Sequence, residues 1–206
     1  MKTYIKIHSL IIFGGLVFTF AGCGFVTSSI EIKNTAVPIS IEKKTCPSIS
    51  VANILSDIPE ETKIGTYHTG CVNIPGADYT ANALSGFEEK IEQEIEKELI
   101  EANYPVIENK EQLFEEKKVD SQILVGGVIS ECKFNSYDSM CGVYSESTVS
   151  VNWKIMNKAE NKIIYEKTTD GSAEYPGVNI YAVAYAVKGS FREVLADPVF
   201  VESLLK

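Results

Sequence analysis

The chain has 206 residues, with 28 acidic and 19 basic side chains and a formal net charge of −9 at pH 7. Such an acidic balance argues against binding nucleic acid, or an anionic membrane face, through a basic patch.

The first 22 residues predict a cleaved secretory signal peptide. Lys2 and Lys6 precede an apolar run from Leu10 to Ala21 that holds no charged residue. The run is short for a membrane-spanning helix, which needs about 20 apolar residues. Cleavage would remove two lysines and no acid, so the mature net charge becomes −9 − 2 = −11. The remaining length suits one hydrophobic core.

The segment that ends the signal peptide, FAGC at positions 20–23, resembles the bacterial lipobox. The resemblance implies a diacylglycerol on the Cys23 thiol, although Phe20 stands where Leu, Val or Ile is usual. Gly24 in the following position implies sorting to the outer membrane, on its periplasmic side. The alternative is that Cys23 is an ordinary buried or disulfide-bonded cysteine.

Residues 23–46 predict a polar, lipidated tether, and residues 47–206 one α/β domain. Within the domain, alternation over residues 48–54 predicts a strand, and the Gly-, Pro- and Thr-rich residues 58–80 predict a long loop. A helix is predicted from Ala81 to about Asn103, because apolar residues recur there at three- and four-residue spacing. Its remaining residues, including the pair Glu94 and Lys97, predict a solvated face. The apolar stripe consists of Leu84, Phe87, Ile91, Ile95, Leu99 and Ala102.

The second half of the domain predicts a short strand at 104–108, a short helix at 110–118 and then a meander. Residues 122–134 are apolar on both faces at their start, as in a central strand. Gly126 and Gly127 suggest a bulge or the close approach of the long helix. Residues 145–157 and 162–170 alternate and predict an antiparallel hairpin. Asn179 is expected to cap a helix through Leu195, and Asp197 a last short helix.

This order of elements predicts an α+β two-layer sandwich. The sheet is expected to be mostly antiparallel, with the long and the C-terminal helices on one face.

Four cysteines remain besides Cys23, namely Cys46, Cys71, Cys132 and Cys141. An even number in an oxidising compartment suggests disulfides, and four cysteines allow three connectivities. The polar segment KFNSYDSM between Cys132 and Cys141 favours their local pairing, which leaves Cys46 with Cys71. The alternative is a metal site built on His68-x-x-Cys71.

The segments SISVANI, LIEANYPVIE, ILVGGVISECKF, the meander and FREVLADPVFVESLL together resemble envelope lipoproteins. The families are the periplasmic auxiliary components of ABC transporters and the curli-secretion lipoproteins. The resemblance implies a domain that builds or bridges an assembly, as a homo- or hetero-oligomer, and does no chemistry. Asn103 stands where those proteins usually have Gly. The start Cys23-Gly24-Phe25 also resembles the lipopolysaccharide-assembly lipoprotein.

Three function classes follow. The first is a non-enzymatic scaffold or adaptor of an envelope complex in secretion, transport or envelope assembly. Its partners would be the membrane and other envelope proteins. The segment expected to contact them is the loop Asp170–Asn179, and the contact residues are Tyr175, Pro176 and Tyr181. The second is a lipid- or lipopolysaccharide-handling protein with an apolar cavity under the long helix. The third, an enzyme, would depend on His68, and no cofactor or metal signature supports it.

Overall fold

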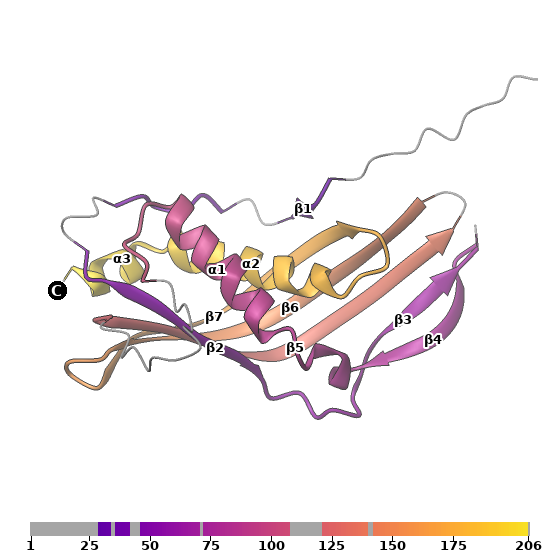
Figure 1. Ribbon diagram of the computed structural model, residues 1–206, viewed down its shortest axis with the longest axis horizontal. Helices are drawn as coiled ribbons and strands as arrows, with labels where there is room; N and C mark the ends of the chain where they lie inside the picture. The colour runs from indigo at the N-terminus through magenta and orange to yellow at the C-terminus, as the bar shows by residue number, and fades with distance from the viewer. Residues whose placement is uncertain are drawn as a thin grey trace, which may run out of the picture.

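A computed structural model describes residues 29–33, 36–41, 46–70, 72–107, 121–139 and 142–205. Two helices, α1 and α2, lie on one side of a long mixed sheet, and the short helix α3 follows α2 at one end (Figure 1). The strands are β1 (Glu31–Ile32), β2 (Ile49–Ser56), β3 (Lys63–Thr69), β4 (Ile74–Thr80), β5 (Ile123–Ser139), β6 (Gly142–Asn157) and β7 (Lys162–Pro176). The helices are a 3-10 turn at Ala81–Leu84, α1 (Glu88–Glu101), α2 (Tyr181–Leu195) and α3 (Pro198–Leu204).

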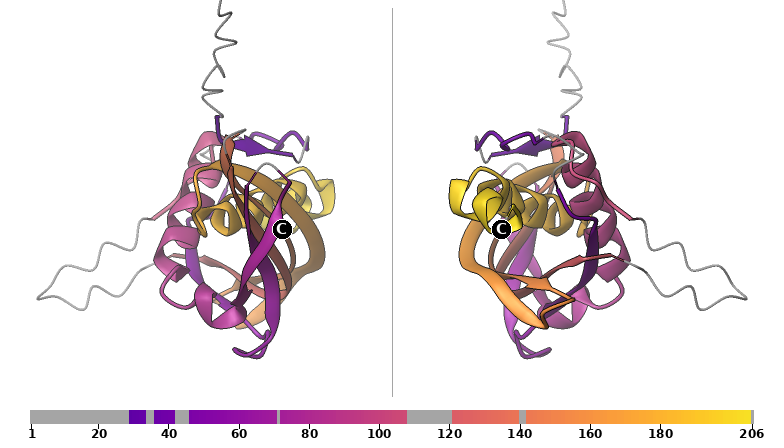
Figure 2. Two further views of the ribbon diagram at one scale, coloured as in Figure 1. Left: turned by 90° about the vertical axis from the view of Figure 1, so that its right-hand side faces the viewer. Right: turned by 90° about the vertical axis from the view of Figure 1, so that its left-hand side faces the viewer.

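The sheet has seven strands in the order β1-β7-β6-β5-β3-β4, with β2 also paired to β5. The long strands β5, β6 and β7 form an antiparallel meander. On the other edge of β5, β2 and β3 pair in parallel with it one after the other, β2 from Ile123 to Ile129 and β3 from Ser136 to Asp138. The predicted α+β sandwich is confirmed, and Figure 2 shows it from its two ends.

Strict alternation in β6 creates the core face of the sheet. Val149, Val151, Trp153 and Ile155 are all buried, and the residues between them point to the opposite face. Trp153 Nε1–H donates to Thr169 Oγ1 at 3.1 Å and to Ser190 Oγ at 3.0 Å, so the indole joins β6, β7 and α2.

Helix α2 packs on β7 at Gly171. A Cβ at that position would lie 1.9 Å from the Ala186 carbonyl oxygen and 2.4 Å from the Ser190 nitrogen, both of the helix backbone. Glycine is therefore required for the observed approach. As predicted, Asn179 Oδ1 accepts from the Tyr181 N–H at 2.9 Å at the helix start, and Asp197 Oδ1 accepts from the Val199 N–H at 2.9 Å at the start of α3.

The predicted helix from Ala81 to Asn103 is interrupted. The 3-10 turn ends before Gly86, whose φ of +85° is in the left-handed region, and α1 starts only at Glu88. The bulge expected at Gly126 and Gly127 is present in the β2–β5 pairing, where the register shifts between Val51, opposite Val125, and Ile54, opposite Gly127. The close neighbour of Gly127 is Trp153 and not the long helix.

Three loop predictions are corrected in the same way. Residues 63–80, expected as loop, form the β3–β4 hairpin, the segment after Cys132 continues β5 to Ser139, and Asp170–Pro176 belongs to β7. In each of them polar side chains occupy a solvent-facing side of a strand, which composition alone does not distinguish from a loop. The expected strand at 104–108 is reduced to a bridge between Val106 and Ile49. The helix expected at 110–118 lies outside the described residues.

Candidate functional site

Tyrosines from β7 and α2 meet the start of α1 at one end of the molecule. Tyr175 stacks on Tyr185 with ring centroids 5.7 Å apart and meets the edge of Tyr181 at 6.0 Å. Phe87 makes an edge contact with Tyr181 at 5.6 Å. Lys90 Nζ lies over both α2 rings, 5.6 Å from the Tyr181 centroid and 5.7 Å from that of Tyr185. We call these five residues the aromatic cluster.

The aromatic cluster is a partly exposed apolar surface with polar tips. Tyr181 is 36 % exposed, and the other four residues are half-buried. Rings of this kind dominate protein interfaces because each offers a large rigid area and a hydroxyl group. The structure thus brings the expected contact residues Tyr175 and Tyr181 together. Phe87 and Lys90 were not singled out in the sequence, because Phe87 served equally well as a core residue of the predicted stripe.

The cluster is connected to buried charges between α1 and α2. Lys90 Nζ and Lys97 Nζ each donate to Glu94 Oε1 at 2.8 Å, although the Glu94 side chain is only 2 % exposed. Burial alone would raise the pKa of Glu94, but the hydrogen bonds from Lys90 and Lys97 outweigh it and lower the pKa. The predicted Glu94–Lys97 pair is present, with Lys97 53 % exposed as expected, but the Glu94 carboxylate is buried and lies 3.8 Å from Lys188 of α2.

Helix α2 contributes two cations to the same layer. Arg192 Nε–H donates to Glu98 Oε1 at 2.7 Å, and Lys188 Nζ lies 3.2 Å from Glu98 Oε2, an ion pair not aligned as a hydrogen bond. Lys188 also lies 3.8 Å from both Glu94 Oε2 and Glu101 Oε2. Since breaking a buried ion pair leaves an uncompensated charge, this layer fixes how α1 sits on α2.

Pro176, the third expected contact residue, lies near the cluster in sequence but belongs to a row on the opposite face of the sheet. Its partner on β6 is Tyr144, which stacks on Tyr137 at 4.6 Å, and Tyr137 stacks on His68 at 4.9 Å. His68 is paired with Pro75 on β4. We call this row of five rings, one from each of five neighbouring strands, the ring row. The Tyr137 hydroxyl donates to Glu146 Oε1 at 2.8 Å, and burial together with that carboxylate raises the pKa of Tyr137 to about 12.

His68, on which the alternative of an enzyme would depend, makes contacts to the backbone and to a tyrosine ring. The Nδ1–H of His68 donates to the Asn73 carbonyl oxygen at 3.3 Å, and its ring is stacked on Tyr137. Cys71, the other residue of the possible metal motif, lies outside the described residues. Among the residues that are described, no group of three or more His, Cys, Asp or Glu side chains is placed to hold a metal ion.

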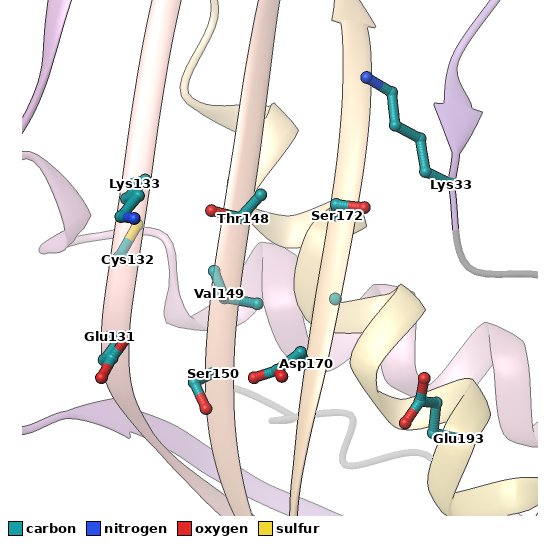
Figure 3. Close-up of a pocket in the computed structure, with 11 residues that line it drawn as sticks. Lys33, Glu131, Cys132, Lys133, Thr148, Val149, Ser150, Asp170, Ser172 and Glu193 are labelled. Atoms are coloured by element: carbon teal, nitrogen blue, oxygen red, sulfur yellow. The ribbon is translucent and has the colours of Figure 1, made fainter.

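A groove of about 570 Å³ crosses the face of the sheet away from the helices (Figure 3). Acidic side chains gather at one end, with Glu193 of α2 beyond the edge of β7, and lysines at the other. Burial raises the pKa of the Cys132 thiol to about 12, which disfavours its thiolate form. The lining residues are Lys33, Glu131, Cys132, Lys133, Thr148, Val149, Ser150, Asp170, Gly171, Ser172 and Glu193. None of these lining residues, all from the described part of the chain, is a histidine.

Cys46 and Cys132 are free thiols in the structure. Their expected partners, Cys71 and Cys141, lie outside the described residues, so the disulfides stay predictions. The register of the hairpin nevertheless disfavours the local pairing. Ser139 pairs with Gly142, and the seven strand residues from Cys132 to Ser139 span about 23 Å at 3.3 Å each, well beyond the 5.5–6 Å typical between disulfide-bonded Cα atoms.

No protein-family model matches the sequence, and comparison with curated proteins finds no significant relative. Solved structures of bacterial proteins are similar in arrangement. A DUF330 protein from Xanthomonas campestris aligns with a TM-score of 0.42 at 11 % identity, over 82 % of this chain and 92 % of its own. Protein CT253 from Chlamydia trachomatis aligns with a TM-score of 0.42 at 14 % identity, over 77 % of this chain and 98 % of its own. A PelC dodecamer from Paraburkholderia phytofirmans aligns with a TM-score of 0.37 at 11 % identity, over 82 % of this chain and 99 % of its own. Similarity at this level carries no functional assignment.

Proposed function

We propose that the protein is a lipid-anchored, non-enzymatic scaffold or adaptor subunit of a bacterial envelope complex, serving secretion, transport or envelope assembly. The single observation that carries the proposal is the aromatic cluster, a half-exposed group of four rings and a lysine. Such a surface recognises another protein through ring packing and hydroxyl hydrogen bonds. The lipobox-like Cys23 supports confinement to the periplasmic side of the outer membrane.

The buried charges behind the cluster support a binding role over a purely structural one. Lys90 takes part in both layers, because it lies over Tyr181 and donates to the buried Glu94. Its ammonium is thereby held over the rings instead of moving freely in solvent. A preorganised surface loses less side-chain entropy on binding than a mobile one.

The proposal is tested by photocrosslinking in intact cells. A photoreactive amino acid is placed at Tyr181, and at Ile163 as the matched control. Ile163 is an exposed apolar residue near the β6–β7 turn, at the other end of the sheet. We expect a discrete crosslinked species from position 181 and none from position 163. Equal, diffuse crosslinking from both positions would show that the aromatic cluster is not a contact surface.

The anchor is tested separately. We expect metabolically supplied palmitate analogue to label the wild-type protein and not Cys23→Ser, which should also leave the membrane fraction. A Cys23→Ser protein that stays membrane-bound and labelled would refute lipidation at this position.

The alternative, a lipid- or lipopolysaccharide-handling protein, is not favoured by a specific observation. That function needs an apolar cavity between the sheet and the helices. Ile91, Ile95 and Leu99 of α1 are instead fully packed in the core, and the groove of Figure 3 lies on the other face, lined mainly by charged and hydroxyl side chains.

A further inference from the structure

One end of the sheet gathers exposed aliphatic side chains. Val72 and Ile74 in the β3–β4 hairpin are 80 % and 56 % exposed, and Ile30, Val143 and Val178 are each more than 40 % exposed. We call these five residues the distal tip. Scattered single apolar residues on a surface need no explanation, but several that gather at one end of a molecule indicate an interaction site.

The pairing of the strands places the distal tip along one row, in which Thr69 and Asp138 lie between Ile74 and Val143. Ile74 pairs with Thr69, which pairs with Asp138, and Asp138 pairs with Val143. The Gly177 N–H then donates to the Val143 carbonyl oxygen at 2.9 Å, which brings the next residue, Val178, to the same end. The row therefore crosses the whole end of the sheet. The ring row lies one residue behind it on the same strands.

The chain enters the fold at this same end. Strand β1 is antiparallel to β7, with Glu31 opposite Glu174, so the residues before Glu31 run toward the end of β7 at Pro176. Further along, the Ile39 N–H donates to the Leu195 carbonyl oxygen at the far end of α2. The described N-terminal residues thus lead from the distal tip toward the opposite end of the molecule, as Figure 1 shows for β1.

From these placements we infer that the distal tip faces the membrane and inserts its aliphatic side chains between lipid headgroups. The inference rests on the proposed lipid anchor at Cys23. Glu31 is eight residues after Cys23 in the chain, a distance of at most about 29 Å. The start of β7 at Lys162 lies 12 strand residues from Glu174, or about 40 Å. An anchor of this length therefore lets the distal tip point at the bilayer, but it is too short for the opposite end to do so.

The chemistry of the two rows fits a bilayer surface. Valine and isoleucine are favoured beyond the headgroups, while tyrosine rings with polar edges are favoured at headgroup level. The charged residues near the tip are mostly acidic: three are carboxylates, Asp138, Glu146 and Glu174, and one is a cation, Lys33. The contact is therefore apolar, and it favours zwitterionic over anionic lipid.

The test uses the full lipidated protein reconstituted in phosphatidylethanolamine–phosphatidylcholine vesicles that contain a nitroxide-labelled lipid. Ile74→Trp reports on the distal tip, Val143→Trp is a second reporter, and Ile163→Trp at the opposite end is the matched control. The native Trp153 is fully buried and gives the same background in all three. We expect quenching at positions 74 and 143 to be severalfold stronger than at 163, and to change little between low and high salt.

The outcomes separate this inference from the proposed function. A protein that floats with the vesicles, but is quenched equally at 74, 143 and 163, has an anchor and no inserted tip, which overturns the inference alone. A protein that fails to float with vesicles lacks the anchor, which overturns both. If the fluorescence at position 74 shifts with protein concentration in the absence of vesicles and is unquenched in their presence, the tip binds a second copy of the chain, and the inference is again overturned.

Discussion

Replacing Gly171 by alanine should be among the most damaging single-methyl additions in this fold. The new Cβ would sit 1.9 Å from the Ala186 carbonyl oxygen, whereas carbon–oxygen contacts are comfortable at about 3.3 Å or more. Helix α2 would have to retreat by about 1.4 Å, the difference between these two distances. The two closest atoms that the new Cβ would meet, the Ala186 oxygen and the Ser190 nitrogen, belong to the backbone of α2, so no side-chain rotation relieves the overlap.

The loss of unfolding free energy follows from the number of α2 residues that are buried. Eleven of its fifteen residues are buried, and a gap of about 0.5–1 Å already removes a quarter to a half of the dispersion energy of each contact. The retreat would also stretch the hydrogen bond from Trp153 Nε1–H to Ser190 Oγ beyond its present 3.0 Å. Overpacking typically costs about 1–3 kcal/mol, and we expect Gly171→Ala at the upper end, about 3 kcal/mol of unfolding free energy. For a chain of this length that corresponds to a Tm lower by about 6–12 °C.

The measurement is urea unfolding followed by Trp153 fluorescence, with Gly126→Ala as the matched control. Gly126 is also a strand glycine, but an added Cβ there has no neighbour closer than 3.9 Å. That control should unfold at or slightly above the wild-type midpoint, because alanine restricts the unfolded chain. If Gly171→Ala unfolds within about 0.5 kcal/mol of the wild type, the usual range of a neutral surface substitution, then α2 does not pack on β7 as described.

Three further predictions concern the charges and the cysteines. Lys188→Met should lower the unfolding free energy by about 3 kcal/mol, because the buried Glu98 keeps its ion pair with Arg192 but loses the one with Lys188. An unchanged urea midpoint would contradict the burial of these charges between α1 and α2. Folding lowers the pKa of Glu94 from 4.5, so the stability that its carboxylate contributes is complete above pH 4.5 and is lost as the pH falls below it. Glu94→Gln should therefore make the unfolding free energy fall less steeply with decreasing pH in the acid range. An unchanged slope would refute this. Peptide mapping without reduction should find no Cys132–Cys141 peptide, because Ser139 and not Cys132 pairs with Gly142, and such a peptide would show that the hairpin register is wrong.

The sequence was most informative where one face of an element is continuous. The alternation in β6 and the capping residues Asn179 and Asp197 predicted the meander and the last two helices, and the structure confirms them. These signals are local, since each depends on residues within one turn or one strand. The fold class followed from their order.

The features that were missed depend on distant residues. The strands of the β3–β4 hairpin are mostly exposed or half-buried because the hairpin extends past the helices, and its turn has Asn73 with φ of 52° after Gly70 with φ of 72°. Glu94 looked like any other solvated glutamate, because nothing within α1 shows that α2 carries Lys188 opposite it. The aromatic cluster likewise joins β7, α1 and α2, which only the tertiary fold brings together.

The order of β2 and β3 along one edge of β5 divides the molecule into two parts with different freedom to change. Strand β2 pairs with the half of β5 that the helices cover, while β3 pairs only with residues near its end. A residue inserted between β2 and β3 would shift the hairpin without altering the register of the packed half. Homologous chains can therefore vary the reach of the hairpin over evolutionary time while they retain the same core.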